Sequence, residues 1–407
     1  MPYALRDVDV ERPLQEVSLA PEESGLALLV RKDGRPLDFV LRELAGGTRL
    51  GPDDLASLIA EASGPAFLRD AIREELTEPA PPRAVSVTIA VCTRERVSDL
   101  QACLQSVLSM LEQPAAGAHD VEILVVDNAP ATDATKELVA SLPNVRYALE
   151  PRPGLDFARN RALEEARGEF VAYVDDDATV DGGWLAGLAE ALSENPDAAA
   201  VTGLVLPTEL ETTAQILFER RGGFRRGFEK LRYEGEHRPG NPVYPCGAGI
   251  FGAGCNMVVR RDVVRGLGGF DEALDTGPPL PGGGDLDIFY RVIRAGLPLV
   301  YEPRMLAFHR HRREYRALRH QYWTWGTGFM AFVTKTYGTD PPQRPKLRRL
   351  VRWWFEYQSR ELGRSVVRRH PLTPDLVLAE FAGGIVGLAG TYKRSLRRVQ
   401  RLRDRFP

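Results

Sequence analysis

The sequence predicts an α/β protein in which a mixed, mostly parallel sheet is flanked by helices. From Val85 onward, short apolar runs alternate with helical stretches, and strands spaced by helices imply right-handed crossovers and parallel pairing. Both ends of the chain differ from this pattern. We therefore expect a small α+β module before the sheet and a helical region after it, which the length of 407 residues allows.

The first 77 residues read as a separate module. Residues 25–31 and 37–41 are strand-like, and Asp33-Gly34 between them predicts a hairpin turn. One helix is expected from Pro52 and a second from Pro65 to Leu76. Residues 78–84 are rich in proline, which is typical of a stiff linker. We find no catalytic constellation in the module, so we interpret it as a docking or oligomerisation platform, with a homo-oligomer as one outcome.

The central domain is predicted over residues 85–335. Expected strands cover 85–91, 121–126, 145–149, 169–174 and 299–308, and expected helices cover 97–111 and 133–142. Open α/β sheets bind ligands at the carboxyl ends of their strands. The residues at those ends, Thr93, Arg96, Asp127 and Asn128, are therefore candidates for a binding site. No P-loop is present in the sequence, and no G-x-G-x-x-G motif follows one of the strands predicted above.

Three consecutive carboxylates, Asp175, Asp176 and Asp177, follow the apolar strand that ends at Val174. Adjacent negative charges repel one another, so a divalent cation or a sugar hydroxyl is expected to relieve them. The alternative is a solvated acidic turn that caps the next helix.

The order of motifs resembles glycosyltransferase family 2, a group of inverting enzymes with a GT-A fold. The resemblance covers about residues 85–335. It rests on the following matches: Ile89 to Arg96, Ile123 to Asn128, Gly154 with Ala158 to Leu163, Asp175 to Asp177, Gly252 to Arg261, Gly268 to Glu272, Gly284 to Asp287, and His309.

The resemblance implies a donor site for a nucleoside diphosphate sugar. Thr93 and Asp127 would contact the nucleobase, where a carboxylate suits the imide N–H of a uracil-like ring. UDP is therefore favoured, with GDP and dTDP as alternatives. Arg96 and Arg159 would contact the diphosphate or the base, because a guanidinium matches phosphate oxygens, although both could also be structural arginines.

Within the acidic run, the resemblance implies that Asp175 faces the ribose and that Asp176 supports its neighbours. Asp177 and His309 would hold a divalent cation, Mn²⁺ or Mg²⁺, together with the substrate phosphates. For His309, a polar surface residue is the alternative.

On the acceptor side, the resemblance implies that Asp285 is the general base, which removes the proton of the attacking hydroxyl. The family usually has Glu-Asp here, whereas this chain has Gly284 before Asp285, so Asp287 is the substitute. Trp323 and Trp325 could stack on an acceptor sugar, although burial in a helical core is the commoner fate of such residues.

Residues 336–407 are predicted to form a basic helical region. The final segment alternates Leu396, Val399, Leu402 and Phe406 with arginines, which is typical of an amphipathic helix on anionic lipid. A helix packed on the catalytic domain is the alternative. The run Leu376–Gly390 contains Glu380 and is shorter than the ~20 residues of a membrane span, so no transmembrane helix is predicted.

Composition limits the remaining choices. The formal net charge of −3 gives no argument for nucleic-acid binding, and we predict no nucleic-acid partner. The four cysteines show no C-x-x-C spacing and the N-terminus lacks a signal-peptide pattern, so a cytoplasmic protein is expected, either free or peripheral at the inner face of the membrane.

The sequence therefore predicts a metal-dependent inverting glycosyltransferase that acts on a carbohydrate or glycoconjugate hydroxyl. Two alternatives remain. One is a nucleotidyltransferase that makes a sugar nucleotide, although the glycine- and lysine-containing signature of those enzymes is missing after the first strand. The other is a catalytically silent scaffold, against which the intact carboxylates at 175, 177 and 285 argue.

Overall fold

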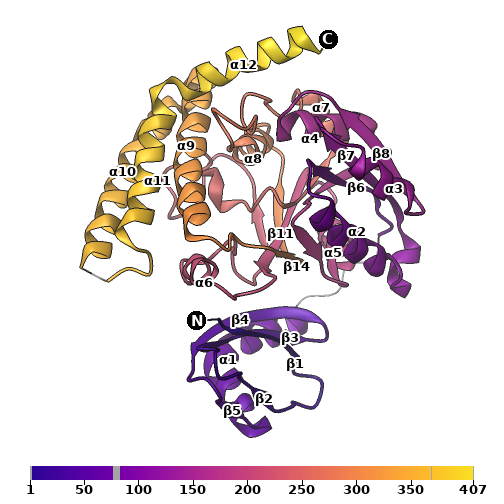
Figure 1. Ribbon diagram of the computed structural model, residues 1–407, viewed down its shortest axis with the longest axis vertical. Helices are drawn as coiled ribbons and strands as arrows, with labels where there is room; N and C mark the ends of the chain where they lie inside the picture. The colour runs from indigo at the N-terminus through magenta and orange to yellow at the C-terminus, as the bar shows by residue number, and fades with distance from the viewer. Residues whose placement is uncertain (1, 77–82, 368, 407) are drawn as a thin grey trace.

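The structure is a computed structural model that describes residues 2–76, 83–367 and 369–406. Figure 1 shows three parts: an N-terminal module, a central α/β domain and a helical C-terminal region. This confirms the predicted fold class. Most of the predicted linker at 78–84 lies outside the described residues.

The N-terminal module is a sheet with one long helix on it. Strand β3 (Gly25–Lys32) pairs antiparallel with β4 (Arg35–Glu43) through the predicted Asp33-Gly34 turn, and β1 (Ala4–Asp9) pairs parallel with β3. Strands β2 (Val17–Ser18) and β5 (Arg49–Leu50) form a small second sheet.

The two helices predicted in this module are one helix, α1 (Pro52–Leu76), which continues through Pro65. Both halves are tied to the sheet, because Ser63 donates to Asp38 at 2.9 Å and Lys32 donates to Asp70 at 3.0 Å. These bonds on either side of Pro65 account for a helix that local sequence rules would have divided.

The central sheet is mixed and has the strand order β10-β14-β11-β13-β9-β6-β7-β8, with β12 on β14. Strands β6, β7, β8 and β9 run parallel, β11 is parallel to β14, and β13 is antiparallel to both of its neighbours. The strands are β6 (Ser86–Thr93), β7 (Asp120–Asn128), β8 (Val145–Glu150), β9 (Phe170–Asp175), β10 (Ala178–Val180), β11 (Ala200–Pro207), β12 (Leu231–Tyr233), β13 (Asn256–Arg260) and β14 (Leu299–His309).

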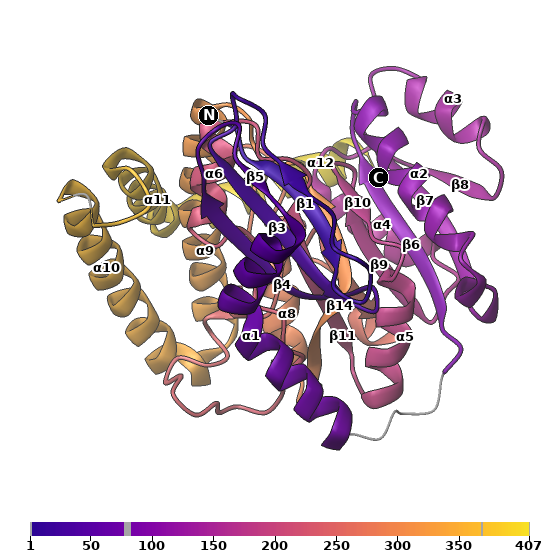
Figure 2. The same ribbon diagram turned by 90° about the horizontal axis from the view of Figure 1, so that it is seen from below.

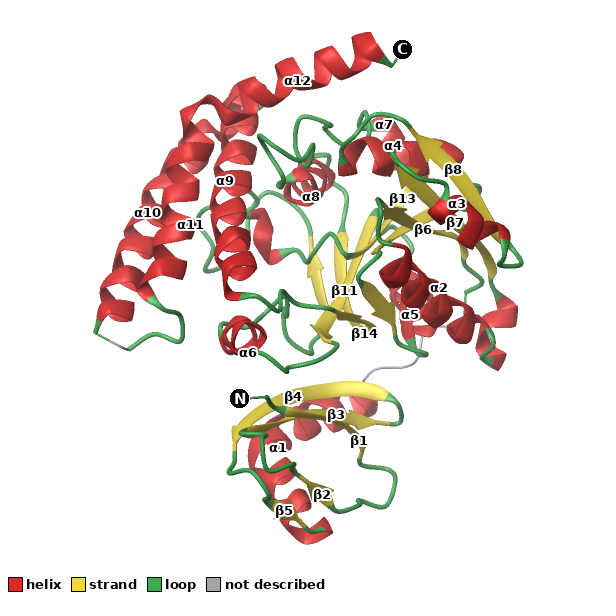
Figure 3. Cartoon of the chain, viewed as in Figure 1, coloured by secondary structure: helices red, strands yellow, loops and turns green. Residues whose placement is uncertain are grey.

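Helices cover both faces of this sheet (Figure 3). Helices α2 (Val97–Leu111) and α5 (Trp184–Glu194) pack on one face, and α4 (Leu155–Glu165) and α8 (Gly284–Arg294) on the other. Alternate residues of β6 enter the two cores, Ile89 on one side and Ala90 on the other, as expected for a strand buried on both faces. The shorter helices are α3 (Ala134–Ala140), α6 (Thr213–Arg220) and α7 (Arg261–Gly266).

The C-terminal region is built on α9 (Tyr315–Thr339), so the domain boundary predicted at 335 falls inside a helix. Helices α10 (Arg344–Val366) and α11 (Pro374–Val386) pack beside it. Glycines allow the close crossing of α9 and α11: a Cβ on Gly326 would lie 2.0 Å from the Glu380 carbonyl oxygen, and one on Gly383 would lie 2.1 Å from that of Trp323.

Helix α12 (Tyr392–Arg405) leaves this bundle at a break in the helical backbone at Ala389 and Gly390. It then contacts the central domain, where Val399 packs with Phe157 and Arg403 pairs with Glu272 at 2.6 Å. Part of the predicted amphipathic helix is therefore docked on the protein itself.

Among the described residues, one helical stretch, Pro374–Arg405, is long and apolar enough to cross a membrane by length and composition alone. The sequence predicts no membrane span, because the apolar run ends at Gly390 and gives no sign that the helix continues to Arg405. The first half of this stretch packs along α9, while Leu378 and Ile385 of that half stay exposed.

The N-terminal module packs directly on the central domain, and Figure 2 shows it in front of β11 and β14. Arg31 pairs with Asp7 of its own module at 2.8 Å and with Asp181 of the central domain at 2.7 Å. The backbone N–H of Tyr3 donates to the Leu210 carbonyl at 2.8 Å.

Candidate functional site

The ends of three parallel strands bring the predicted donor residues together. In the β6–β7 register Thr93 lies opposite Asp127, and in the β6–β9 register Cys92 lies opposite Asp175. The candidate residues identified separately along the sequence therefore share one edge of the sheet, at the carboxyl ends of its strands.

His309 joins this edge through strand pairing. The chain turns after Asp177 into β10, which pairs antiparallel with β14 and places Ala178 opposite His309. The His309 Nε2 atom lies 3.3 Å from Asp177 Oδ1, and one ligand atom each from Asp175, Asp177 and His309 lie within 4.8 Å of one another. The geometry thus assembles the two predicted metal ligands and adds Asp175 to them.

Asp176 points to a different set of partners. Its Oδ2 accepts a hydrogen bond from the Thr93 hydroxyl at 2.8 Å, and its Oδ1 accepts one from Arg96 at 2.9 Å. Arg96 also donates to Asp177 at 3.0 Å. Thr93 and Arg96, predicted to contact the donor, are thus engaged in neutralising and orienting the acidic run. Arg96 remains 41% exposed in its side chain, which leaves it open to a ligand.

The neighbouring carboxylates have opposite electrostatic environments. Burial, and secondarily the charge of Asp177, raises the pKa of Asp175 to about 6 although Arg159 opposes the change. Burial also acts to raise the pKa of Asp177, but the hydrogen bond and charge of His309, together with Arg96, outweigh it and hold that pKa well below its usual range. Asp177 is therefore the stable anionic member of the cluster.

Asp127 has one carboxylate oxygen available. Its Oδ2 accepts a hydrogen bond from the Tyr147 hydroxyl at 3.0 Å, while its Oδ1 is buried and has no hydrogen-bond partner among the described residues. Burial raises the pKa of this carboxyl. An unpaired buried acceptor is costly unless a ligand satisfies it, which agrees with the predicted contact to a base N–H.

Arg159 is placed differently from the prediction of a diphosphate contact. Its side chain is 4% exposed, and its Nη1 pairs with Asp156 at 3.0 Å and with Asp275 at 3.4 Å. A direct contact with a phosphate would require these buried pairs to break. Arg159 is instead a buried positive charge beside Asp156, Asp275 and Asp175. Its charge lowers the pKa of Asp175 and so partly offsets the effect of burial.

Asp285 is the second residue of α8, in the first turn of the helix. Its Oδ2 accepts from the backbone N–H of Gly254 at 3.1 Å and its Oδ1 from that of Leu286 at 2.8 Å, while the residue stays partly exposed. Asp287 is fully buried and pairs with Arg291 at 2.7 Å and with Lys335. Asp287 therefore has no access to an acceptor hydroxyl, and the substitute role proposed for it from sequence does not fit its position.

The two tryptophans lie on α9 and are partly buried. Trp325 packs against Phe218 and Phe224, and Phe224 contacts the His309 ring with 5.1 Å between centroids. Trp323 stacks on His320. Helical packing, the alternative considered from sequence, describes both rings, and their role toward an acceptor stays a prediction.

Sequence reasoning missed several residues behind this edge: Tyr147, Asp156, Glu219, Asp275 and His311. The pattern His309-Arg310-His311, with two histidines two residues apart where β14 ends, could have revealed His311. Glu219 and Asp156 are on helices and carried no comparable signal.

The family model described as glycosyl transferase family 2 matches residues 88–267. This chain belongs to glycosyltransferase family 2. The match includes Thr93, Asp127 and the acidic run, whereas Asp285 and His309 lie beyond it and are joined to it here by strand pairing and by the Gly254 contact.

Two curated relatives and one solved structure illustrate the likeness. Glucosyl-dolichyl phosphate glucuronosyltransferase of Haloferax volcanii is 28% identical over 46% of this chain and 56% of the relative. Succinoglycan biosynthesis protein ExoM of Rhizobium meliloti is 30% identical over 55% of this chain and 66% of the relative. The mannosyltransferase PcManGT of Pyrobaculum calidifontis, solved with GDP-Man and Mn²⁺, is 16% identical with a TM-score of 0.46, covering 84% and 96% of the two chains. The chain spans about half the length of the first curated relatives that it matches.

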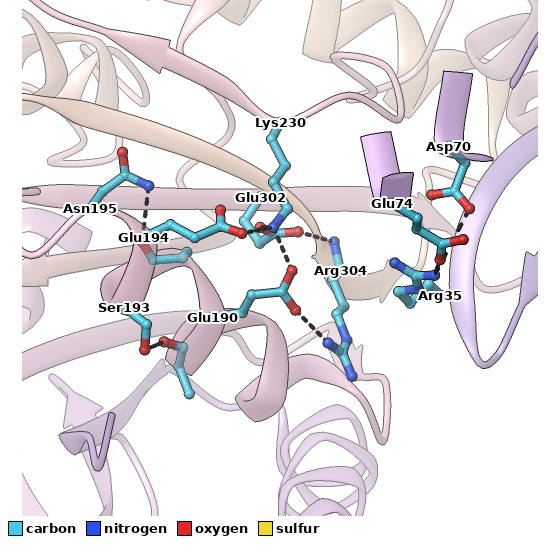
Figure 4. Close-up of polar contacts among 12 residues, drawn as sticks. Arg35, Asp70, Glu74, Glu190, Ser193, Glu194, Asn195, Lys230, Glu302 and Arg304 are labelled. Carbon is cyan, nitrogen blue, oxygen red and sulfur yellow. Dashed lines mark hydrogen bonds and ion pairs between the residues drawn. The ribbon is translucent and has the colours of Figure 1, made fainter. Parts of the chain in front are cut away.

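A second acidic cluster, Glu190, Glu194 and Glu302, lies toward the start of β14, at the opposite end of that strand from His309. Figure 4 shows Lys230 reaching into it. The Lys230 ammonium lies 2.8 Å from Glu194 and 3.4 Å from Glu302, and it also pairs with Glu190. The cluster borders a cleft of about 980 Å³ beside the N-terminal module. Lys230 therefore pairs with all three carboxylates of this cluster.

Because Glu302 is buried, its protonation makes the free energy of unfolding depend on pH. Burial raises the pKa of Glu302 to about 7, against the attraction of Lys230. The folded protein therefore keeps a proton that the unfolded chain releases above its ordinary pKa near 4.5, and stability falls as pH rises from there to 7. We expect the Glu302→Gln variant not to lose this stability. Its free energy of unfolding relative to wild type should therefore be higher at pH 8 than at pH 5, by up to about 3 kcal/mol.

Denaturant unfolding of both proteins at the two pH values measures this gain. Glu194→Gln, an exposed member of the same cluster, serves as the matched control and should show no comparable gain. An equal difference between Glu302→Gln and wild type at both pH values would contradict the expectation.

Proposed function

We propose that this protein is a metal-dependent inverting glycosyltransferase that moves a sugar from a nucleoside diphosphate donor to an acceptor hydroxyl by single displacement. The observation that carries the proposal is the convergence, at one sheet edge, of Asp127, Asp177, His309 and Asp285 from four separate elements. Membership of glycosyltransferase family 2 supports the same reaction class.

The donor half of the site is supported by Asp127 and the acidic run. The free buried oxygen of Asp127 would accept the imide N–H of a uracil ring, so we favour a UDP-sugar over GDP- or dTDP-sugars. Asp175, partly exposed at the end of β9 with β6 between it and Asp127, would contact the ribose. Asp176 would hold Thr93 and Arg96 in place.

The donor set at Asp177 and His309 fits a divalent cation. Two carboxylates and one imidazole nitrogen converge within 4.8 Å, and Asp177 is the carboxylate whose pKa is held low. Oxygen ligands with an imidazole suit Mn²⁺, and Mg²⁺ also accepts one or two carboxylates plus phosphates. When bound, the cation would neutralise charge on the diphosphate leaving group. Asp177 and His309 would hold it on the protein side.

Asp285 would act as the general base. Its carboxylate takes the proton of the acceptor hydroxyl, the hydroxyl oxygen forms a bond to the anomeric carbon, and the bond from that carbon to the diphosphate oxygen breaks with its electron pair on the diphosphate. Attack from the face opposite the leaving group inverts the anomeric carbon. The N–H groups of Gly254 and Leu286 orient the Asp285 carboxylate for this step.

The Asp285→Asn variant separates transfer from donor binding. We expect kcat to fall by ~10²–10⁴, because the amide cannot accept the proton, while the thermal shift produced by UDP with Mn²⁺ stays at the wild-type value. Product formation from UDP-, GDP- and dTDP-sugars is measured by mass spectrometry. Asp262→Asn, an exposed carboxylate on α7, is the control and should keep full activity. Wild-type turnover by Asp285→Asn would exclude this base, and no transfer by wild type from any of these donors would exclude the proposed function.

We also propose that the C-terminal region makes peripheral contact with anionic lipid, so that the enzyme would work at the inner face of the membrane. Exposed apolar side chains on α10, α11 and α12 support this: Trp353, Leu378, Ile385 and Leu396. The arginines of α10 and α12 supply the positive charge that such surfaces attract.

Co-sedimentation with lipid vesicles tests this contact. The protein should bind vesicles that contain phosphatidylserine and should leave them in high salt, whereas neutral phosphatidylcholine vesicles should retain little protein. Leu396→Asp, on an exposed position of α12, should weaken the binding. Equal binding to both lipids, or none to either, would contradict peripheral contact driven by charge.

A further inference from the structure

A chain of buried polar contacts extends from the acidic run to the N-terminal module. Asp177 contacts His309 at 3.3 Å, and His309 Nδ1 lies 3.2 Å from His311 Nδ1. His311 Nε2 lies 2.8 Å from Glu219 Oε1 on α6. His311 and Glu219 are 1% and 0% exposed in their side chains, so solvent does not compete for these contacts.

Glu219 is held in turn by Arg225. The Arg225 Nε lies 3.3 Å from Glu219 Oε2, and its Nη2 donates to the Glu219 carbonyl at 3.1 Å. The other arm of the guanidinium donates to the carbonyl oxygen of Phe39 in the N-terminal module at 3.3 Å, and the guanidinium also lies over the Phe39 ring. Strand β4 of the module therefore contacts the residue that anchors Glu219.

The directions of these hydrogen bonds follow from Glu219, at one end of the series of contacts. Glu219 is a carboxylate and only accepts, so His311 Nε2 donates to it and His311 Nδ1 carries a lone pair. His309 Nδ1 must then donate to His311, so Nε2 is the ring nitrogen of His309 that faces Asp177 and the one placed to bind a metal ion.

We propose that Glu219 is a positioning residue that sets, through His311, the tautomer and orientation of His309 as a metal ligand, and that the N-terminal module supports this residue through Arg225. The inference rests on the proposed metal-dependent function. It assigns to the module a part in organising the donor site, in addition to any docking role. Ligand histidines commonly give their second ring nitrogen to a carboxylate or carbonyl, and here a second imidazole extends that link.

Aromatic packing keeps the two imidazoles in this alignment. The Phe224 ring packs against both imidazoles, with ring centroids 5.1 Å from His309 and 5.8 Å from His311. The centroids of Phe218 and His311 are 4.7 Å apart. Because Phe218, Glu219, Phe224 and Arg225 lie in one short segment, the same stretch of chain supplies both the packing and the anchoring charge.

The experiment measures Mn²⁺ binding directly, by electron paramagnetic resonance of free Mn²⁺ titrated with protein, alone and with UDP. Glu219→Gln keeps the size and an accepting oxygen but removes the charge that fixes the His311 tautomer, and we expect Mn²⁺ affinity to fall by about 10–100-fold. Glu211→Gln is the matched control, since Glu211 pairs with the exposed Arg313 outside the chain of contacts, and its affinity should equal that of wild type.

Two further variants distinguish failure of the metal site from failure of the positioning role of Glu219. Asp177→Asn removes a ligand itself, so Mn²⁺ affinity unchanged in that variant would overturn the metal site and with it the proposed function. If Asp177→Asn loses Mn²⁺ while Glu219→Gln binds as tightly as wild type, the metal site stands and the positioning role of Glu219 fails. If Glu219→Gln does not fold, Arg225→Lys decides: it keeps the charge but loses the fork to Glu219 and Phe39, so weaker Mn²⁺ binding supports the inference and wild-type binding overturns it.

Discussion

Repulsion among Asp175, Asp176 and Asp177 is the constraint on which the site depends. Three carboxylates at the end of one buried strand are tolerated only because each meets a different environment. Asp176 is paired with Thr93 and Arg96, Asp177 faces His309, and burial favours the protonated form of Asp175. The division leaves one strongly anionic oxygen ligand beside an imidazole, which is the arrangement that a hard cation at a diphosphate requires.

Carboxylates near the proposed acceptor side are also neutralised by buried positive charges. Arg159 is buried among Asp156 and Asp275, so it supplies a fixed positive charge near Asp175. Asp287, only two residues from Asp285, is neutralised by Arg291 and Lys335 and holds α8 against α9. The two carboxylates therefore differ in their surroundings, Asp287 buried and paired and Asp285 partly exposed, because residues two apart on a helix point to different sides.

Local patterns were sufficient to predict the elements that carry the site. Strands β6, β7 and β9 are apolar runs that end in polar residues, and the strand-end rule located Thr93, Asp127 and the acidic run at one edge. Pairings between distant segments could not be predicted in this way. The antiparallel insertion of β13, the parallel β1 and the single helix through Pro65 depend on tertiary contacts that leave no periodic signal. For the same reason the link between His311 and Glu219, 92 residues apart in sequence, was invisible, and Arg159 appeared to be free for a phosphate.

The central claim is that the cluster at Asp177 and His309 binds the metal. It is tested most directly by a crystal structure with Mn²⁺ and UDP, with anomalous scattering measured at the manganese edge. We predict one anomalous peak coordinated by Asp177 and His309, and none at Glu190, Glu194 and Glu302, all three of which pair with Lys230. A peak at the second cluster, or none at Asp177 with nucleotide bound, would contradict it.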